Sequence, residues 1–465
     1  MINYFLSVCC AVLAFVYIVV AFPEGFSAVM LVAVLSAIII AVIRNKTTDA
    51  NYLQQLFLGG LIIRLTFGLV IYFFDLRGFF GSDWVLYDFL GHRLTEIWFS
   101  NAPIDDLWST RALATSGAGW GMNYLVGFIY TFTGRNALAA QAFCGTIGAA
   151  TVPMVYFCAG NVFNNKRVAK IAALLVAFYP AFVIWSAQLL KDGLIIFLLV
   201  LAMTMVLQLQ KEISYVAIAV LVVCLFGILT LRFYIFYMAA VAVLGSFIVG
   251  TSNSTQSVVR RLVILILMGV GLTYIGALKD ADKDINNYAD LKRIQQSRGG
   301  LAQSESGFGN NLDVSTTDGA ISALPVGFTY LMLAPFPWEV SNFRQALTLP
   351  EMILWWSSIP FLLIGLWYTI RKKLRPAIAI LIFSLMLTIG YSLFQGNVGT
   401  AYRQRTQIQV FLFMFIAVGW TIRQEEKENL SQVREFQRVR FRKNFLKRDL
   451  QRSEYEQQNR DTEQR

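Results

Sequence analysis

Charged residues are scarce in this sequence of 465 amino acids: they make up only 14% of it, whereas 57% of the residues are hydrophobic. A soluble domain carries roughly 25% charged residues, so this composition excludes an ordinary soluble fold. Apolar runs of about 17 to 23 residues recur along the chain, and a helix needs about 20 apolar residues to cross a bilayer. The sequence therefore predicts an all-α polytopic membrane protein.

Residue types that bind metals are also scarce. His92 is the only histidine, which excludes a site built from several imidazoles. The five cysteines lie inside apolar runs without metal-ligand spacing and are interpreted as small buried hydrophobic residues. Residues 280–284 resemble the start of a calcium loop, but Ile285 stands where that loop needs glycine and Leu291 where it needs glutamate. No metal site is assigned from these residues.

About twelve runs are long and apolar enough to be predicted as membrane spans, with ends uncertain by about 2–4 residues. They lie at residues 3–21, 26–43, 56–74, 138–158, 168–186, 193–209, 214–231, 233–250, 262–278, 352–370, 376–394 and 406–422. The first run has no basic residue before it and no small-residue cleavage site after it, so we expect a retained span and not a signal peptide.

Basic residues in the short connections predict the orientation of these spans. With twelve spans, the clusters at 44–46, 166–170, 211, 260–261 and 371–375 fall on one side. Because short cytoplasmic loops carry an excess of lysine and arginine, we expect both termini to be cytoplasmic. The net charge of +11 is explained in this way, and no nucleic-acid partner is expected. Function is expected on the opposite, outer face.

The outer face receives the longest polar segments, and the chain divides accordingly. The expected parts are an N-terminal transmembrane hairpin (1–55), a transmembrane catalytic core (56–278) with an outer loop (75–137), an outer polar loop (279–351), C-terminal transmembrane helices (352–422) and a basic amphipathic cytoplasmic tail (423–465). Apolar residues from Trp84 to Trp98 recur at helical spacing, which predicts a helix lying along the membrane surface. Runs 122–132 and 321–333 are too short to span and are also expected to be interfacial.

Asp83 is the first candidate for chemistry. It lies in the stretch Gly-Ser-Asp-Trp-Val-Leu-Tyr-Asp at 81–88, directly after the span at 56–74. A carboxylate at headgroup depth is within reach of water and of a lipid-borne phosphate, and it can act as a general base. Because Ser82 and Asp83 also precede the predicted surface helix, either residue could instead cap that helix.

Arginines at an outer boundary run against the positive-inside tendency, so an anion on that side is expected to compensate them. Arg403 and Arg405 lie in such a place, and a guanidinium offers paired donors to phosphate oxygens. Ordinary lipid headgroups are the alternative ligand. Arg64 lies about midway along its span and is expected to face the bundle interior, supporting the site from below or pairing with an acid.

The segment from Asp83 to Tyr87, with the helix that follows, resembles the first outer loop of GT-C superfamily glycosyltransferases, near the protein-mannosyltransferase and aminoarabinose-transferase branch. The later motifs 133–136, 161–167, 179–186 and 191–192 follow in a similar order, so the resemblance covers roughly residues 56–210. It implies that Asp83 is the catalytic base, and Trp84 stands where the family usually has a second acid. The candidate substrate-binding residues are Tyr87, Asp88, Lys191, Asp192, Arg403 and Arg405.

The resemblance implies a polyprenyl-phosphate-dependent hexosyl or pentosyl transferase. One displacement would invert the anomeric configuration, with the arginines stabilising the leaving phosphate. The expected partners are a polyprenyl-phosphate sugar donor, a glycan, lipid or protein acceptor, and membrane lipids. The expected setting is cell-envelope polysaccharide biosynthesis in a bacterial inner membrane, with a periplasmic site. The cofactor is left open, because Asp83 and Asp192 can share a divalent metal only if the fold brings them together.

Two other functions stay open from the sequence. A polysaccharide polymerase or O-antigen ligase acting on a polyprenyl-diphosphate glycan would depend on Arg403 and Arg405 more than on Asp83. A flippase for a lipid-linked glycan is the non-enzymatic alternative. Transporters are often built from two repeated halves, and no such duplication is visible here.

Overall fold

The computed structural model describes residues 2–100, 102–115, 119–249, 255–274 and 290–463, with the side chains of 249, 255–258, 260 and 433–463 left undescribed. Within these residues the fold is all-α, with one isolated bridge between Gly307 and Asn397 and no strand. The predicted all-α fold is confirmed. The calcium-like residues 280–284 lie outside the described part of the chain.

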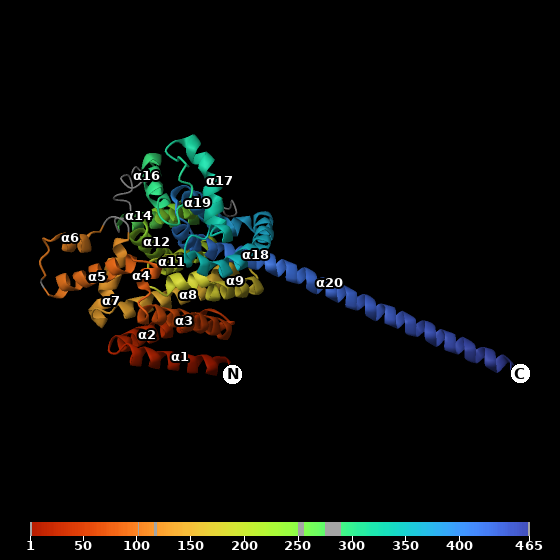
Figure 1. The fold of residues 1–465 in the computed structure, drawn as a ribbon. Helices are drawn as coiled ribbons and strands as arrows, with labels where there is room; N and C mark the ends of the chain where they lie inside the picture. Colours follow the sequence, from red (N-terminus) through yellow and green to blue (C-terminus); the bar gives the residue numbers. More distant parts are fainter. Residues whose placement is uncertain (1, 101, 116–118, 250–254, 275–289, 464–465) are drawn as a thin grey trace.

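Most of the helices that the structure describes follow one another with short connections, and residues 303–316 form a longer one (Figure 1). They are α1 (Ile2–Val20), α2 (Glu24–Lys46), α3 (Ala50–Phe73), α4 (Arg77–Phe80), α5 (Asp83–Phe99), α6 (Leu107–Leu113), α7 (Trp120–Thr133), α8 (Ala137–Phe163), α9 (Lys166–Phe178), α10 (Pro180–Ser186), α11 (Asp192–Lys211), α12 (Tyr215–Leu231), α13 (Phe233–Val249), α14 (Thr255–Tyr274), α16 (Leu291–Ala302), α17 (Thr317–Leu333), η1 (Pro337–Glu339), α18 (Phe343–Lys372), α19 (Leu374–Phe394) and α20 (Val398–Glu463).

Eight helices in the described residues are long and apolar enough to cross a membrane: α1, α2, α3, α8, α11, α18, α19 and the first part of α20. Helices α9 and α10 together make a ninth candidate, bent by 55°. Three shorter apolar helices, Tyr215–Leu231, Phe233–Ile248 and Arg261–Tyr274, coincide with the remaining expected spans. Multiple spans are thus confirmed, whereas the number twelve stays a prediction.

Helix α8 lies at the centre of the bundle. It packs against α2 and α3 on one side and against α9 and α11 on another, while α18 packs along α20 and α13 along α19 (Figure 1). Small residues permit this close packing: Gly148 approaches Ser186 so tightly that a Cβ atom there would lie 2.3 Å from the serine Cβ. The helices α5 and α7 form where surface helices were expected and pack against each other beside this bundle.

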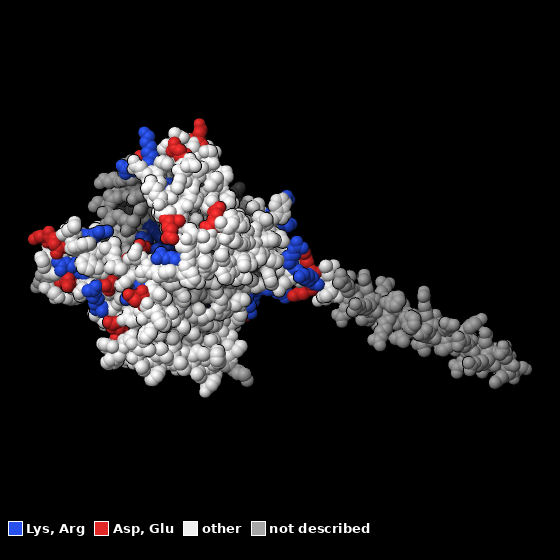
Figure 2. All heavy atoms as spheres, in the orientation of Figure 1, with Lys and Arg blue, Asp and Glu red and all other residues white. Residues whose placement is uncertain are grey.

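Polar side chains mark the two ends of the bundle. At one end, Asp49 binds Tyr156, Lys166 and Lys170, and the hydrogen bonds from Tyr156 and Lys170 lower the pKa of Asp49 to about 2. Figure 2 shows charged side chains gathered near α5 and α6 and around the point where α20 leaves the body, with largely uncharged surface over α1–α3. The predicted tail is the continuation of α20, whose side chains beyond 432 are undescribed.

Arg64 is fully buried, and it binds backbone carbonyls and a hydroxyl instead of an acid. Its Nη atoms donate to the carbonyls of Val176 and Ala177, and its Nε donates to Ser186 Oγ at 2.9 Å. Pro180 has no N–H and bends the chain, so the last carbonyls of α9 lack their usual partners. Arg64 faces the interior, as expected. It supplies hydrogen-bond donors to the carbonyls of Val176 and Ala177, which lack backbone N–H partners at the break between α9 and α10.

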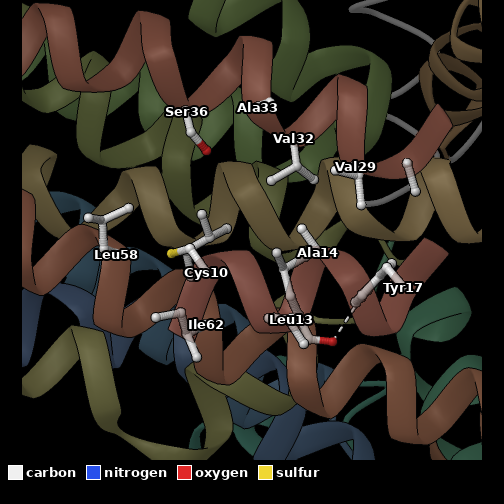
Figure 3. A pocket seen from close by; sticks show the side chains of 13 residues that line it. Cys10, Leu13, Ala14, Tyr17, Val29, Val32, Ala33, Ser36, Leu58 and Ile62 are labelled. Atoms are coloured by element: carbon white, nitrogen blue, oxygen red, sulfur yellow. Dashed lines mark hydrogen bonds between the residues drawn. The ribbon is translucent and has the colours of Figure 1, made fainter. Parts of the chain in front are cut away.

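A cavity of about 200 Å³ lies between α1, α2 and α3 (Figure 3). Its lining is apolar, from residues such as Leu13, Val32 and Leu61, and Tyr17 at its edge donates a hydrogen bond to the carbonyl of Leu65. None of the predicted site residues lines it. The cavity is thus unsuited to charged chemistry, which must be sought elsewhere.

We expect Arg64→Leu to destabilise the fold by about 1–3 kcal/mol, because two buried carbonyls lose their charged donor. The midpoint of thermal unfolding in detergent measures this. Arg375→Leu, which changes an exposed arginine, serves as the control and should leave the midpoint unchanged. Equal midpoints for the two variants would contradict this role for Arg64.

Candidate active site

Four charged side chains from separate parts of the chain meet at one place. They are Asp83 at the start of α5, Asp192 at the start of α11, Arg232 between α12 and α13, and Arg403 in α20. The guanidinium of Arg403 contacts both acids: Nη1 lies 3.2 Å from Asp83 Oδ2, and Nε lies 2.7 Å from Asp192 Oδ2. The fold therefore brings together two acids that lie more than a hundred residues apart.

Asp192 is the buried centre of this cluster, with no exposed surface. Its Oδ1 accepts a hydrogen bond from Arg232 Nη2 at 3.0 Å, and Gln407 Nε2 lies 3.5 Å from the same oxygen. Tyr391 donates to the Gln407 carbonyl oxygen at 2.6 Å, which turns the amide nitrogen toward Asp192. As the first residue of α11, Asp192 is also favoured by the positive end of the helix dipole.

Asp83 forms the exposed edge of the cluster. Its side chain is 48% exposed, whereas that of Arg403 is only 14% exposed. The N-cap residue of α5 is Ser82, which makes no side-chain cap hydrogen bond, and Asp83 is the first helical residue. The Asp83 carboxylate thus lies against Arg403 on one side and is open to solvent on the other.

Lys191 and Tyr87 border the same space. A Cβ atom on Gly119 would lie 2.8 Å from Lys191 Nζ and 3.7 Å from the Tyr87 hydroxyl, and Gly119 has a φ of +83°, so only glycine fits this turn comfortably. Burial, followed by the charge of Arg232, lowers the pKa of Lys191 to about 8. Burial raises the pKa of Tyr87, because it disfavours the charged phenolate. In the described part of the chain the Lys191 ammonium has no ion-pair or hydrogen-bond partner.

The charges of the cluster do not balance. Three cations, Lys191, Arg232 and Arg403, stand against the two carboxylates of Asp83 and Asp192. One positive charge is therefore left for an anion. Since Lys191 is the cation of this cluster that has no partner among the described residues, a phosphate oxygen bound beside it would complete the cluster.

Two predicted residues lie apart from this cluster. Asp88 accepts hydrogen bonds from Tyr130 at 2.6 Å and from Arg135 at 2.7 Å, so it faces α7. Arg405 is fully buried and donates to the carbonyls of Met332 and Ala334 at the end of α17. Both differences follow from helix geometry: a residue two or five positions away points to another side of the helix, at about 100° per residue.

Sequence reasoning missed Arg232, Gln407 and the role of Trp185, whose ring centroid lies 5.4 Å from the Arg403 guanidinium carbon. Arg232 carried a usable signal. It stands between the predicted spans 214–231 and 233–250, at an outer boundary, which is the same exception to the positive-inside tendency that drew attention to Arg403. Gln407 follows Arg403 by four residues and so shares its helix face.

Metal ligands do not gather in the described residues, among which no group of three or more His, Cys, Asp or Glu side chains is placed to hold an ion. His92 instead lies 3.5 Å from Glu96, one turn along α5.

Residues 104–274 match the family model of dolichyl-phosphate-mannose-protein mannosyltransferase. The matched stretch contains Lys191, Asp192 and Arg232, but neither Asp83 nor Arg403. None of the curated proteins matches this chain. The family match confirms the resemblance to the protein-mannosyltransferase branch of the GT-C superfamily and supports a membrane glycosyltransferase.

Two structures of the Archaeoglobus fulgidus oligosaccharyltransferase are similar to this chain. The apo form is 14% identical, with a TM-score of 0.43, and the match covers 81% of this chain and 51% of that one. The complex with Zn and sulfate is 15% identical, with a TM-score of 0.42, and the match covers 78% and 49%. The chain thus spans about half the length of these solved structures. At this identity and TM-score the likeness does not bear on the chemistry of the site.

We expect Asp192→Asn to destabilise the protein by about 3 kcal/mol or more, because it leaves the buried Arg232 without its counter-charge and Arg403 with only the half-exposed Asp83. Asp83→Asn removes the same charge from a half-exposed carboxylate and should cost less than about 1 kcal/mol. Unfolding midpoints of the two isosteric variants in detergent make the comparison. An equal loss of stability would contradict the buried, central position of Asp192.

Proposed function

We propose that this membrane glycosyltransferase moves a single sugar from a polyprenyl-phosphate donor to a hydroxyl of a glycan, lipid or protein acceptor, with Asp83 as the base. The observation that carries the proposal is the half-exposed Asp83 carboxylate at the edge of a buried cluster with a surplus positive charge. A base and a phosphate site then lie side by side. Both are needed when a hydroxyl attacks a sugar carbon that bears a phosphate.

The reaction we propose is one displacement. The acceptor oxygen forms a bond to the anomeric carbon while its proton passes to Asp83. The bond from that carbon to the phosphate oxygen breaks, and its electron pair stays on the leaving polyprenyl phosphate. Lys191 and the Nη1 edge of Arg403 stabilise the negative charge that develops there. Attack opposite the leaving group inverts the anomeric configuration.

The remaining side chains hold these groups in place. Asp192, which also accepts from Gln407, fixes Arg403 from the buried side, and Trp185 covers its guanidinium. Arg405 belongs to the support of the site in this proposal, since its donors are used by the carbonyls that end α17. The polymerase or ligase alternative gave Arg403 and Arg405 a common role at the substrate, and the separation of their side chains favours the single-sugar transferase.

The same residues support a proposal for the side of the membrane on which the site lies. Asp83, Lys191, Arg232 and Arg403 come from segments that the spans and basic residues predict to be on the outer face. The opposite end holds Lys166 and Lys170 with Asp49. We therefore propose a periplasmic site in a bacterial inner membrane, with both termini in the cytoplasm, serving the synthesis of cell-envelope glycans.

We expect Asp83→Asn to lower kcat for sugar transfer by about 10²- to 10⁴-fold, because the acceptor loses its base, while donor binding is kept. Transfer from a radiolabelled polyprenyl-phosphate sugar and binding of the unreacted donor are measured on the purified protein. Asp105→Asn, which changes an exposed acid in the same outer loop, is the control and should leave both unchanged. If Asp83→Asn stays active while Arg403→Ala fails, the polymerase or ligase alternative replaces this proposal.

We expect KM for the donor to rise about three- to tenfold between pH 7 and pH 9. Because the pKa of Lys191 is about 8, its ammonium loses its proton in this range and with it the attraction for phosphate. A phosphodiester donor keeps its charge throughout, so the donor itself adds no titration. Lys191→Arg keeps the positive charge, and its KM should be flat over the same range. The same rise in both proteins would rule out Lys191 as the phosphate ligand.

A further inference from the structure

The meeting of Asp83 and Asp192 raises the question of a shared divalent ion. A metal bound between two carboxylates would neutralise them and present a positive charge to the donor phosphate. In this structure the position between the acids is taken by Arg403. Its Nη1 reaches Asp83 and its Nε and Nη2 reach Asp192, at 3.2, 2.7 and 2.5 Å.

We infer that Arg403 replaces a divalent cation, so that sugar transfer by this protein requires no metal. The inference rests on the proposed function and adds the nature of the charge that holds the two acids and the phosphate together. Arg403 is a positioning residue toward Asp83 and a binding residue toward the donor. Its charge is part of the chain and does not depend on an ion from solution.

The donor set fits a guanidinium better than a metal. Magnesium and calcium prefer six or more oxygen ligands, and here two carboxylates supply the charged oxygens. Oδ1 of Asp192 is already bound to Arg232, and Oδ2 is bound to Arg403. A guanidinium, in contrast, has donors on several sides and can serve both acids at once.

The charge around Arg403 argues in the same direction. Arg232 and Lys191 lie beside the two acids, so a divalent ion added to Arg403 would raise the sum of positive charges to five against two carboxylates. An ion that displaced Arg403 would leave the guanidinium buried without a partner, which is costly. The Trp185 ring against Arg403 adds a contact that favours the planar guanidinium at this place.

If Arg403 stands in the place of a divalent ion, its removal should allow such an ion to bind there. Without Arg403 the two carboxylates would keep Arg232 on the buried side and Lys191 beside them, and the place between the two acids would be free for an ion. Like charges held close attract a cation. Arg403→Ser should therefore create a divalent site that the wild-type protein lacks, and Asp192→Asn in the same chain should remove it again.

The experiment measures binding of Mn²⁺ to the purified full chain by the loss of the free-ion electron paramagnetic resonance signal, in parallel with sugar transfer. The wild-type protein and Asp192→Asn are expected to bind the same amount of Mn²⁺, because the wild type has no Mn²⁺ site at Asp192. The transfer rate of the wild type should change less than twofold in EDTA. Arg403→Ser is expected to bind one Mn²⁺ per chain, and Arg403→Ser with Asp192→Asn none. Arg375→Ser, far from the cluster, is the matched control and should bind as the wild type does.

The inference is overturned if the wild-type chain binds one Mn²⁺ through Asp83 or Asp192, or if EDTA lowers transfer more than tenfold and Mn²⁺ restores it. It is also overturned if folded Arg403→Ser binds none. If that variant does not fold, the wild-type binding and EDTA measurements decide the matter. Because Mn²⁺ binding is read without turnover, a failure of the proposed transferase function is seen separately, as absent transfer with the binding pattern unchanged.

Discussion

The buried carboxylate of Asp192 is the group on which the rest of the site depends. It has no contact with solvent, and it is held by two guanidinium groups from parts of the chain that are otherwise distant. A buried charge is tolerated only when it is paired and hydrogen-bonded. Asp192 is a counter-charge for both arginines, and both arginines are counter-charges for Asp192. This mutual requirement fixes Arg403, and Arg403 in turn fixes the place of Asp83 beside the open side of the cluster.

Interruptions of the helices make such a site possible inside an apolar bundle. Arg232 lies where α12 ends and α13 begins, and Lys191 and Asp192 lie where α11 begins. In a continuous helix the backbone polar groups bind one another. At each interruption some of these groups lose their partners and can bind other side chains. The break between α9 and α10 needs its own donor, which Arg64 supplies from α3. Charged residues in this protein therefore gather at the candidate site in one place and bind broken backbone in another.

Much of the fold was predictable from hydropathy alone, because a bilayer imposes a length and a polarity on every span separately. The predicted runs reappear as helices in the described residues, although α18 and α20 begin well before their runs, α20 continues beyond its run, and the run 168–186 is broken at Pro180. Helices also form where Trp84–Trp98 and 122–132 were expected. The residues of the predicted site fall into two groups, those that the fold brings together and those that it does not. Asp83, Lys191, Asp192 and Arg403 come together, whereas Asp88 binds Tyr130 and Arg405 binds the end of α17. Arg232 was not singled out, although its place between two spans carried the same signal as Arg403.

By itself the sequence predicted which segments are apolar enough to cross the membrane, which connections share one side, and which charged residues stand at the ends of those segments. These properties are local, since hydropathy and charge act on each segment without reference to the others. Only the tertiary structure decided that Arg403 bridges Asp83 and Asp192, and that Arg405, two residues later, faces away. The reason is that an ion pair depends on the rotation of each helix and on the packing of helices far apart in sequence, and neither can be read from one segment alone.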